Sequence, residues 1–375
     1  MNLQNFTYGP LNCQIDIHTP GKRFNYIHLD HSDVRHAFGT IQIPIAIIKG
    51  GSGPCVLLSA GNHGDEYEGQ CILRRLIEQI DYQDVNGTLI VLPAINMPAV
   101  EMAQRTSPLD NGNLNRSFPG HKEQGPTKAI AGFVTQCIFP LIDYGIDFHS
   151  GGSSATYVNS AFLSVSHADD VLRKSLQLVE AFAAPFTLVA PSGNTATDMD
   201  SCAHSFGIPF ISCELGGAGQ VSIDSLSIGW QGLLRVLSDQ VNVSDRCPLV
   251  KTIEKPLTAT QYVDTYNQCS YVTANHRGLF EPLQQLGKHV TRHQDAARIY
   301  GTQAFLEPLE KLSFNSSGIV IIQRRDSLVS CGDHLYCVAT PITKTQVLNR
   351  STTPIERDLC TSSHVDETAS DHQPS

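Results

Sequence analysis

The chain has 375 residues, of which 41% are hydrophobic and 17% are charged, and its formal charge at pH 7 is −10. No apolar run reaches the roughly 18 residues that a membrane-spanning helix needs, so nothing indicates a membrane protein. A negative charge without a Lys/Arg cluster argues against nucleic acid as a partner. The length indicates a globular protein with more than one domain.

The N-terminal segment lacks the features of a secretory signal. It has neither a basic stretch nor an apolar run, so we expect a cytoplasmic protein. The eleven cysteines are scattered singly, without a Cys-x-x-Cys pair. This pattern favours reduced thiols over a disulfide framework.

Strands and helices are predicted to alternate through the first two thirds of the chain. Residues 24–30 and 39–49 have the pattern of paired strands. After them, apolar runs and helical periodicity predict strands at 55–60, 88–94, 144–148 and 208–213, and helices at 67–80, 127–140, 171–184 and 226–241. This alternation predicts an α/β domain over residues 1–245, with a mainly parallel or mixed sheet covered by helices on both faces.

A second domain of a different kind is expected after residue 245. Helical periodicity disappears, and short strands in two similar half-segments, 278–300 and 318–339, indicate a small β-sandwich or barrel over residues 246–343. Residues 344–375 are polar, with little to bury, and we expect them to form a disordered tail.

Metal-ligand side chains follow two of the predicted central strands. His63 and Glu66 are three residues apart at the start of a helix, so their side chains point the same way. His149 ends another strand, and Asp147 lies on the same strand face, where it can orient the imidazole. Each motif alone also fits a structural role, but ligands bind at the carboxyl ends of strands in open α/β sheets. We therefore predict one zinc ion per chain, held by His63, Glu66 and His149 with a fourth position open for water.

A third strand end and one loop add groups for catalysis and binding. Glu214 follows a mostly apolar strand, and a buried carboxylate is costly unless it is paired or used, so we assign it as a general base. Arg105 and Arg116 lie in a loop rich in Gly, Asn and Pro. A guanidinium binds a carboxylate through two parallel hydrogen bonds, so this loop is predicted to anchor a substrate carboxylate. The alternative is a surface loop with solvated arginines.

Taken in order, these motifs resemble the succinylglutamate desuccinylase/aspartoacylase family, which is related to the zinc carboxypeptidases. The resemblance covers most of the first domain. It implies three metal ligands, a catalytic glutamate, an arginine that polarises the scissile carbonyl, and an Asn-Arg pair that holds the substrate carboxylate: His63, Glu66 and His149, then Glu214, Arg105, and Asn115 with Arg116.

One position departs from the family pattern. The family often has an aspartate two residues before the Asn-Arg pair, where this chain has Asn113. Asp110 lies further upstream, and the sequence leaves open which residue replaces that aspartate. The second domain resembles, more loosely, the β-domain of bacterial deacylase-like proteins and carrier folds. It lacks an acceptor lysine at a hairpin tip, so we expect it to shape the mouth of the cleft or an oligomer interface.

Together these features predict a zinc-dependent hydrolase that cleaves the amide bond of a small N-acyl amino acid. Zinc lowers the pKa of a water molecule to near 7, and Glu214 takes its proton. The partner is a small carboxylate-bearing molecule, a homo-oligomer is left open, and the resemblance suggests an N-acetylated diamino acid as one substrate. The alternatives are a zinc carboxypeptidase acting on short peptides and, in another class, a non-catalytic binding or carrier protein.

Overall fold

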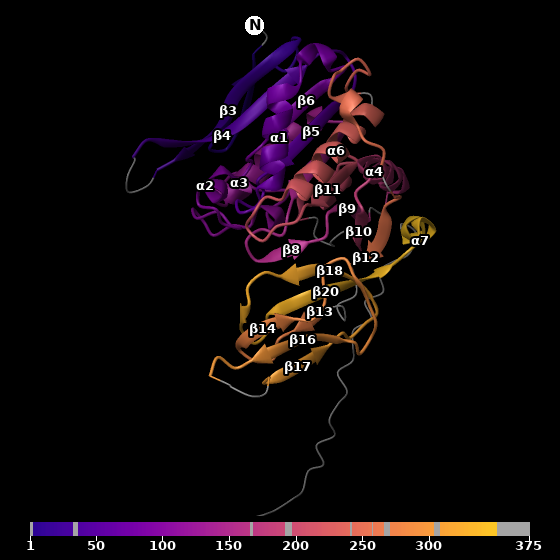
Figure 1. Ribbon diagram of the computed structural model, residues 1–375. Coiled ribbons are helices and arrows are strands. Elements are labelled where there is room, and N and C mark those ends of the chain that lie inside the picture. The colour runs from indigo at the N-terminus through magenta and orange to yellow at the C-terminus, as the bar shows by residue number, and fades with distance from the viewer. Residues whose placement is uncertain are drawn as a thin grey trace, which may run out of the picture.

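The computed structural model describes residues 3–32, 37–165, 168–191, 197–240, 242–256, 258–265, 271–303 and 308–350 (Figure 1). Within these ranges an α/β part is followed by a smaller part made mostly of strands. No helix in them is long and apolar enough to cross a lipid bilayer. The cytoplasmic location stays a prediction.

The elements follow one another in this order along the chain. The α/β part contains strands β1 (Gln4–Tyr8), β2 (Leu11–Ile15), β3 (Gly21–His31), β4 (Gly39–Lys49), β5 (Cys55–Ala60), β6 (Thr88–Leu92), β7 (Tyr144–His149), β8 (Ala155–Tyr157), β9 (Ser160–Val165), β10 (Phe186–Pro191) and β11 (Phe210–Glu214). Its helices are α1 (Glu68–Gln79), α2 (Met97–Glu101), α3 (Pro126–Phe133), α4 (Asp169–Phe182), α5 (Met199–Ser205) and α6 (Ile223–Asp239). The C-terminal part contains β12 (Gln261–Asp264), β13 (Tyr271–Thr273), β14 (Gly278–Pro282), β15 (His289–Val290), β16 (Asp295–Tyr300), β17 (Glu310–Ser313), β18 (Gly318–Arg324), β19 (Leu328–Val329), β20 (His334–Pro341) and α7 (Lys344–Asn349).

The centre of the sheet is parallel. β5 lies between β6 and β7, and β11 joins β7 in the same direction. Nearly every side chain of these strands is buried, as expected for strands that are covered on both faces. β4 and β9 pair antiparallel at the two sides of this group. The sheet is therefore mixed, as predicted.

Helices cover both faces of this sheet. α1, α4 and α6 pack on one face, where Leu76, Val179 and Leu233 belong to the same buried core. α3 and α5 pack on the other face, around Phe133, Phe210 and their neighbours. α6 begins where the Ser222 side chain accepts a hydrogen bond from the backbone N–H of Ser225, which caps the helix. The predicted α/β architecture is confirmed.

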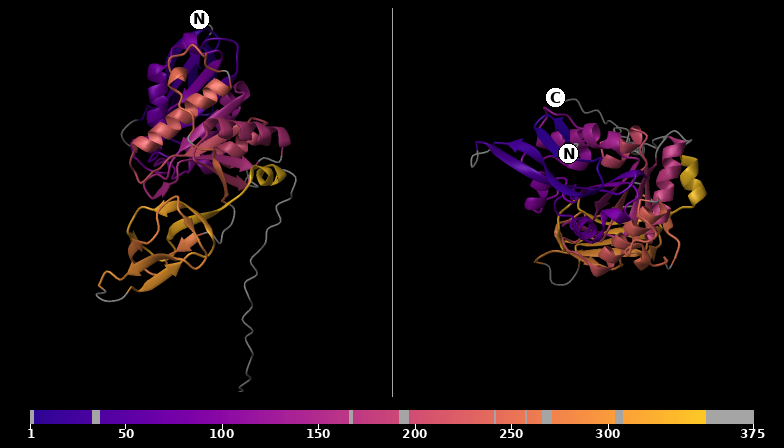
Figure 2. Two further views of the ribbon diagram at one scale, coloured as in Figure 1. Left: turned by 45° about the vertical axis from the view of Figure 1, so that its right-hand side comes forward. Right: turned by 90° about the horizontal axis from the view of Figure 1, so that it is seen from above.

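The C-terminal part is joined to the α/β part by strand pairing (Figures 1 and 2). β18 pairs antiparallel with β8, and β12 pairs with both β10 and β20. A separate sheet of β17, β16, β14 and β19 faces β13, β18 and β20 across a core that includes Phe280, Ile299 and Tyr336. This is the small β domain that was expected. Since the larger sheet continues through β12, a boundary at residue 245 stays a prediction.

The expectation of a disordered tail from residue 344 is wrong for its first residues. Thr343 and Gln346 form a reciprocal capping box at the start of α7, and Val347 is buried in the core of the α/β part. A cap and one apolar side chain are enough to dock a short helix on an existing surface, although the composition is polar. Residues 351–375 lie outside the described residues.

Close packing of α6 on α4 predicts a destabilising substitution. A Cβ at Gly232 would lie 2.7 Å from three ring atoms of the buried Phe182. In an open helix Gly→Ala stabilises by about 1 kcal/mol, but overpacking costs roughly 1–3 kcal/mol. Gly232→Ala should therefore lower the free energy of unfolding, measured by urea denaturation. Ser227→Ala, on the exposed side of α6, is the control and should not lower it. An unchanged or higher stability of Gly232→Ala would contradict this packing.

Candidate active site

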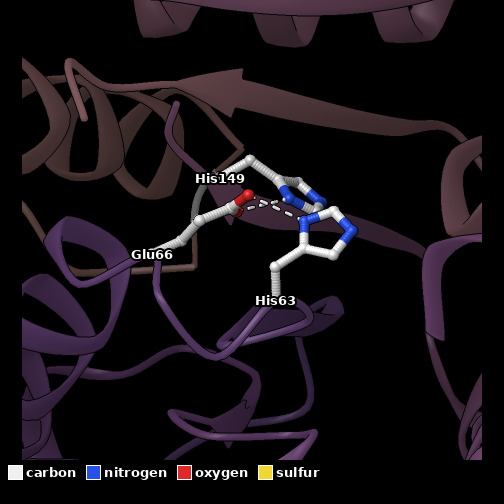
Figure 3. Close-up of side chains that lie close together, drawn as sticks. All are labelled: His63, Glu66 and His149. Atoms are coloured by element: carbon white, nitrogen blue, oxygen red, sulfur yellow. Dashed lines mark hydrogen bonds and ion pairs between the residues drawn. The ribbon is translucent and has the colours of Figure 1, made fainter. Parts of the chain in front are cut away.

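Three buried side chains converge where β5 and β7 end (Figure 3). His63 and Glu66 lie in the turn between β5 and α1, and His149 is the last residue of β7. The Glu66 carboxylate lies between the two imidazoles, with Oε1 2.7 Å from His63 Nδ1 and Oε2 2.8 Å from His149 Nδ1. One ligand atom from each residue lies within 4.8 Å of the others. Two imidazoles and one carboxylate are a donor set that suits zinc.

A buried carboxylate holds the outer side of His149. Nε2 of His149 lies 2.8 Å from Oδ2 of Asp147, which is fully buried. Asp147 in turn accepts hydrogen bonds from Ser59 Oγ at 2.7 Å and from Asn62 Nδ2 at 3.0 Å. A partner at Nε2 leaves Nδ1 as the atom that faces the ligand position. The contact predicted between Asp147 and His149 is confirmed.

His63 is oriented by an amide where His149 has a carboxylate. Nε2 of His63 lies 3.2 Å from Oδ1 of Asn113. Asp110 is used elsewhere, because it accepts hydrogen bonds from Gly112 N at 3.0 Å, Thr127 N at 2.9 Å and Thr127 Oγ1 at 2.6 Å. Asn113 therefore contacts the site, whereas Asp110 stabilises the loop that carries it.

The electrostatics of the three residues favour a cation. Burial alone would lower the pKa of His149, but Asp147 and Glu66 outweigh burial and raise that pKa well above its ordinary value. Burial would likewise raise the pKa of Glu66, yet the neighbouring His149 and His63 hold it well below its usual range. Two carboxylates around one imidazole draw positive charge to the point where a metal ion would bind. The residues fit a divalent ion.

Glu214 lies next to this group on the neighbouring strand. Its Cα is the register partner of His149 in the parallel β11–β7 pair. Burial, and then the negative charge of Glu66, raise the pKa of the Glu214 carboxyl well above its ordinary value. Its Oε2 has no hydrogen-bond partner in the part of the chain that the structure describes. Glu214 is thus a proton-accepting group placed beside the metal-ligand residues.

The loop that carries Arg105, Asn115 and Arg116 lies beside the metal-ligand residues. Arg105 Nη1 lies 3.4 Å from Glu66 Oε1, and its side chain is 53% exposed. Arg116 is also exposed and donates to the backbone oxygen of Asn115 at 2.6 Å. Asn115 Oδ1 accepts a hydrogen bond from Met199 N at 3.0 Å, which ties the loop to α5.

All seven predicted site residues line one cavity of about 750 Å³. The structure brings them together, and the role of each stays a prediction. The C-terminal part also contributes walls to this cavity, through Tyr271, Ile321, Ile322 and Cys337. The second domain therefore forms part of the cavity wall, while its expected role at the cleft mouth or in an oligomer interface stays a prediction.

Several lining residues had no signal in the sequence. The most polar of them are Tyr157, Ser164, Asp198, Asp200 and Ser212. Tyr157 and Ser164 come from β8 and β9, and Asp198 and Asp200 from the start of α5, none of which the sequence pattern predicted. Ser212 lies on β11, which it did predict. The alternation of polar Ser212 and Glu214 with apolar residues in the strand Phe-Ile-Ser-Cys-Glu was the one available hint.

Comparison with known proteins agrees with the fold and the site. Residues 52–239 match the family model of the succinylglutamate desuccinylase/aspartoacylase catalytic domain. The N-alpha-acetyl-L-2,4-diaminobutyric acid deacetylase of Halomonas elongata is 32% identical over 331 residues, which cover 88% of this chain and 95% of that protein. The chain belongs to the succinylglutamate desuccinylase/aspartoacylase family. It is an amidohydrolase that acts on N-acyl amide bonds.

Solved structures show the same similarity over nearly the whole chain. The product-bound ectoine utilization protein EutE (DoeB) of Ruegeria pomeroyi has a TM-score of 0.83 and 31% identity, covering 89% of this chain and 100% of that chain. A succinylglutamate desuccinylase/aspartoacylase of Rhodobacter sphaeroides has a TM-score of 0.81 and 32% identity, again covering 89% and 100%.

The contact between Asn113 and His63 predicts a change in metal affinity. Asn113→Ala removes the group that orients His63, and loss of such an outer partner typically weakens metal binding about 10–100-fold. Competition with a chromogenic zinc chelator measures the change. Asp110→Ala is the matched control, expected to lower thermal stability while leaving zinc affinity close to that of the wild type. An equal loss of affinity in both variants would show that loop order, and not the His63 contact, is responsible.

Proposed function

We propose that this chain is a zinc-dependent deacylase that hydrolyses the amide bond of a small N-acetylated amino acid, and of an N-acetylated diamino acid in particular. The observation that carries the proposal is that Glu214, Arg105 and Arg116 line the same cavity as the three convergent ligand atoms. The relative in Halomonas elongata is a deacetylase of N-alpha-acetyl-L-2,4-diaminobutyric acid, which supports the choice of acyl group and substrate.

Each residue has a defined part in the reaction. One Zn²⁺ per chain, when held by His63, Glu66 and His149, supplies polarisation of the acyl carbonyl and a lowered pKa for water. Glu214 accepts the proton of the attacking water and then donates it to the leaving amine nitrogen. Its raised pKa suits a group that must both accept and return a proton.

Arg105 and Arg116 have different roles, one in stabilising the intermediate and the other in binding the substrate. The exposed guanidinium of Arg105, beside Glu66, faces the oxyanion of the tetrahedral intermediate and stabilises its charge. Arg116 and Asn115 hold the carboxylate of the amino acid, which fixes the scissile bond relative to Glu214. The products are a carboxylic acid and a free amino acid.

A substrate screen tests the proposal directly. Zinc-loaded protein is incubated with N-acetyl amino acids, N-succinyl amino acids and dipeptides, and the products are identified by mass spectrometry. We expect hydrolysis of N-acetyl amino acids. Preferential cleavage of dipeptides would assign the chain to the carboxypeptidases, and no hydrolysis of any amide would contradict the proposal.

Substitution of Glu214 and of His63 should separate chemistry from metal binding. Glu214→Gln keeps the size of the side chain but removes the proton acceptor, so kcat should fall by about 10²–10⁴-fold while bound zinc stays at one per chain. His63→Ala removes a ligand and should lose the metal. Zinc content is measured by atomic emission on the purified proteins. Wild-type activity in either variant would contradict the assignment.

Replacement of Arg116 should act mainly on substrate affinity. Arg116→Ala removes the cation that binds the carboxylate, so KM should rise by about 10–100-fold, the loss expected for a charge-assisted hydrogen bond. Steady-state kinetics on the substrate from the screen measures KM and kcat separately. The control is Arg173→Ala on the exposed face of α4. An unchanged KM would place the anion site elsewhere.

A further inference from the structure

The cavity extends beyond the residues that the reaction uses. Its floor is one face of the sheet, formed by alternate side chains of β9 and β11. Ser212 lies two residues before Glu214 on β11, so it is on the same face and roughly 7 Å further from the metal-ligand end. In the antiparallel register Ser212 is opposite Phe162 of β9, and Ser164 lies two residues further in the same direction. The cavity thus has a second, polar end.

The buried carboxylate of Asp200 lies at this polar end of the cavity. The side chain of Asp200 is only 5% exposed and lines the cavity. One of its oxygens, Oδ1, accepts a hydrogen bond from Ser212 Oγ at 2.6 Å. Its other oxygen has no hydrogen bond or ion pair in the described ranges. Asp198, which caps α5, lines the same end, and neither aspartate forms a salt bridge with a Lys or Arg of the described residues.

Ser164 is an independent sign that this end receives a ligand. Its side chain is 3% exposed and lines the cavity. Its hydroxyl forms no hydrogen bond with another described residue, and it is not among the polar atoms that the protein encloses completely, so it is open to the cavity. A hydroxyl that lines the cavity and has no protein partner is available to hydrogen-bond a polar group of a bound ligand.

We propose that Asp200, together with Asp198 and Ser164, binds the free ammonium group of the substrate side chain and so selects N-acyl diamino acids. The inference rests on the proposed function, because it places the scissile amide beside Glu214. An ammonium has three donors, which match a carboxylate, a second carboxylate and a hydroxyl without other partners. The ligand class is a short side chain that ends in a primary amine.

The place of the carboxylate site supports this assignment. In an amino acid the carboxylate and the side chain leave the same Cα, so the sites that bind them must be neighbours. Asn115 accepts a hydrogen bond from Met199 N, which lies between Asp198 and Asp200 in sequence. The Asn-Arg pair and the acidic end of the cavity are therefore joined by a direct contact.

The two aspartates at this end disfavour acidic substrate side chains. Burial, and then the charge of Asp198, raise the pKa of Asp200 to about 7. A carboxylate brought beside these residues would be repelled, whereas a cation would stabilise their ionised form. Substrates with aspartate-like or glutamate-like side chains should therefore be poor.

Two substrates that differ in one group test the proposal. Nα-acetyl-2,4-diaminobutyrate carries the free ammonium at the end of its side chain. Nα-acetylnorvaline has a methyl group in the same position. For the wild type, kcat/KM should favour the diamino substrate by at least about 100-fold, and Asp200→Asn should reduce this ratio below about 10-fold, as expected when one partner of a buried charge pair is removed. Asn retains an acceptor for Ser212, and Asp198→Asn, which preserves the helix cap, is a second variant that should also reduce the ratio.

The controls separate this inference from the proposed function. Asp170→Asn, an exposed position on α4, should keep the wild-type ratio. Equal kcat/KM for the two substrates in the wild type, or an unchanged ratio in both Asp200→Asn and Asp198→Asn, overturns the inference while N-acyl hydrolysis stands. If no amide in the substrate screen is hydrolysed, the proposed function fails, and calorimetry then tests whether the cavity binds an amine. Tighter binding of 2,4-diaminobutyrate than of norvaline, lost in Asp200→Asn, supports the site, and equal binding overturns it.

Discussion

The buried carboxylate of Glu66 is the constraint on which the rest of the site depends. A charge removed from water is tolerated only when it is closely paired, and Glu66 meets this requirement with one oxygen toward His63 and the other toward His149. These partners come from two different strand ends. The pairing therefore fixes the β5–α1 turn against the end of β7, and the remaining groups of the cavity are placed relative to that junction.

The parts of the molecule that follow from local pattern could be predicted from the sequence. The central strands are continuous apolar runs because they are covered on both faces, and their polar ends carry His63, His149 and Glu214. Since parallel strands end at the same edge of a sheet, these residues had to lie close together. Glu214 and His149 are indeed register partners in the parallel β11–β7 pair, as this expectation requires.

The parts that depend on contacts between distant segments could not be predicted. Nothing local distinguishes Asn113 from Asp110 as the partner of His63, because the choice depends on how the loop closes against Thr127. Asp200 gives no signal for the same reason, since its place in the cavity depends on the packing of α5 against β11. The error at α7 is different in kind, because a polar composition does not exclude a short capped helix.

The strand pairings that join the C-terminal part to the α/β part limit how the enzyme can open. β18 is bonded to β8, and β20 to β12, so two separate lines of backbone hydrogen bonds fasten this part beside the cavity. A hinge motion of the whole part would break bonds in both lines, at a cost of about 1 kcal/mol for each. The wall that the C-terminal part contributes to the cavity is therefore held in place by the backbone, whereas Arg105 and Arg116 are exposed side chains of the same cavity that can change rotamer without breaking those bonds.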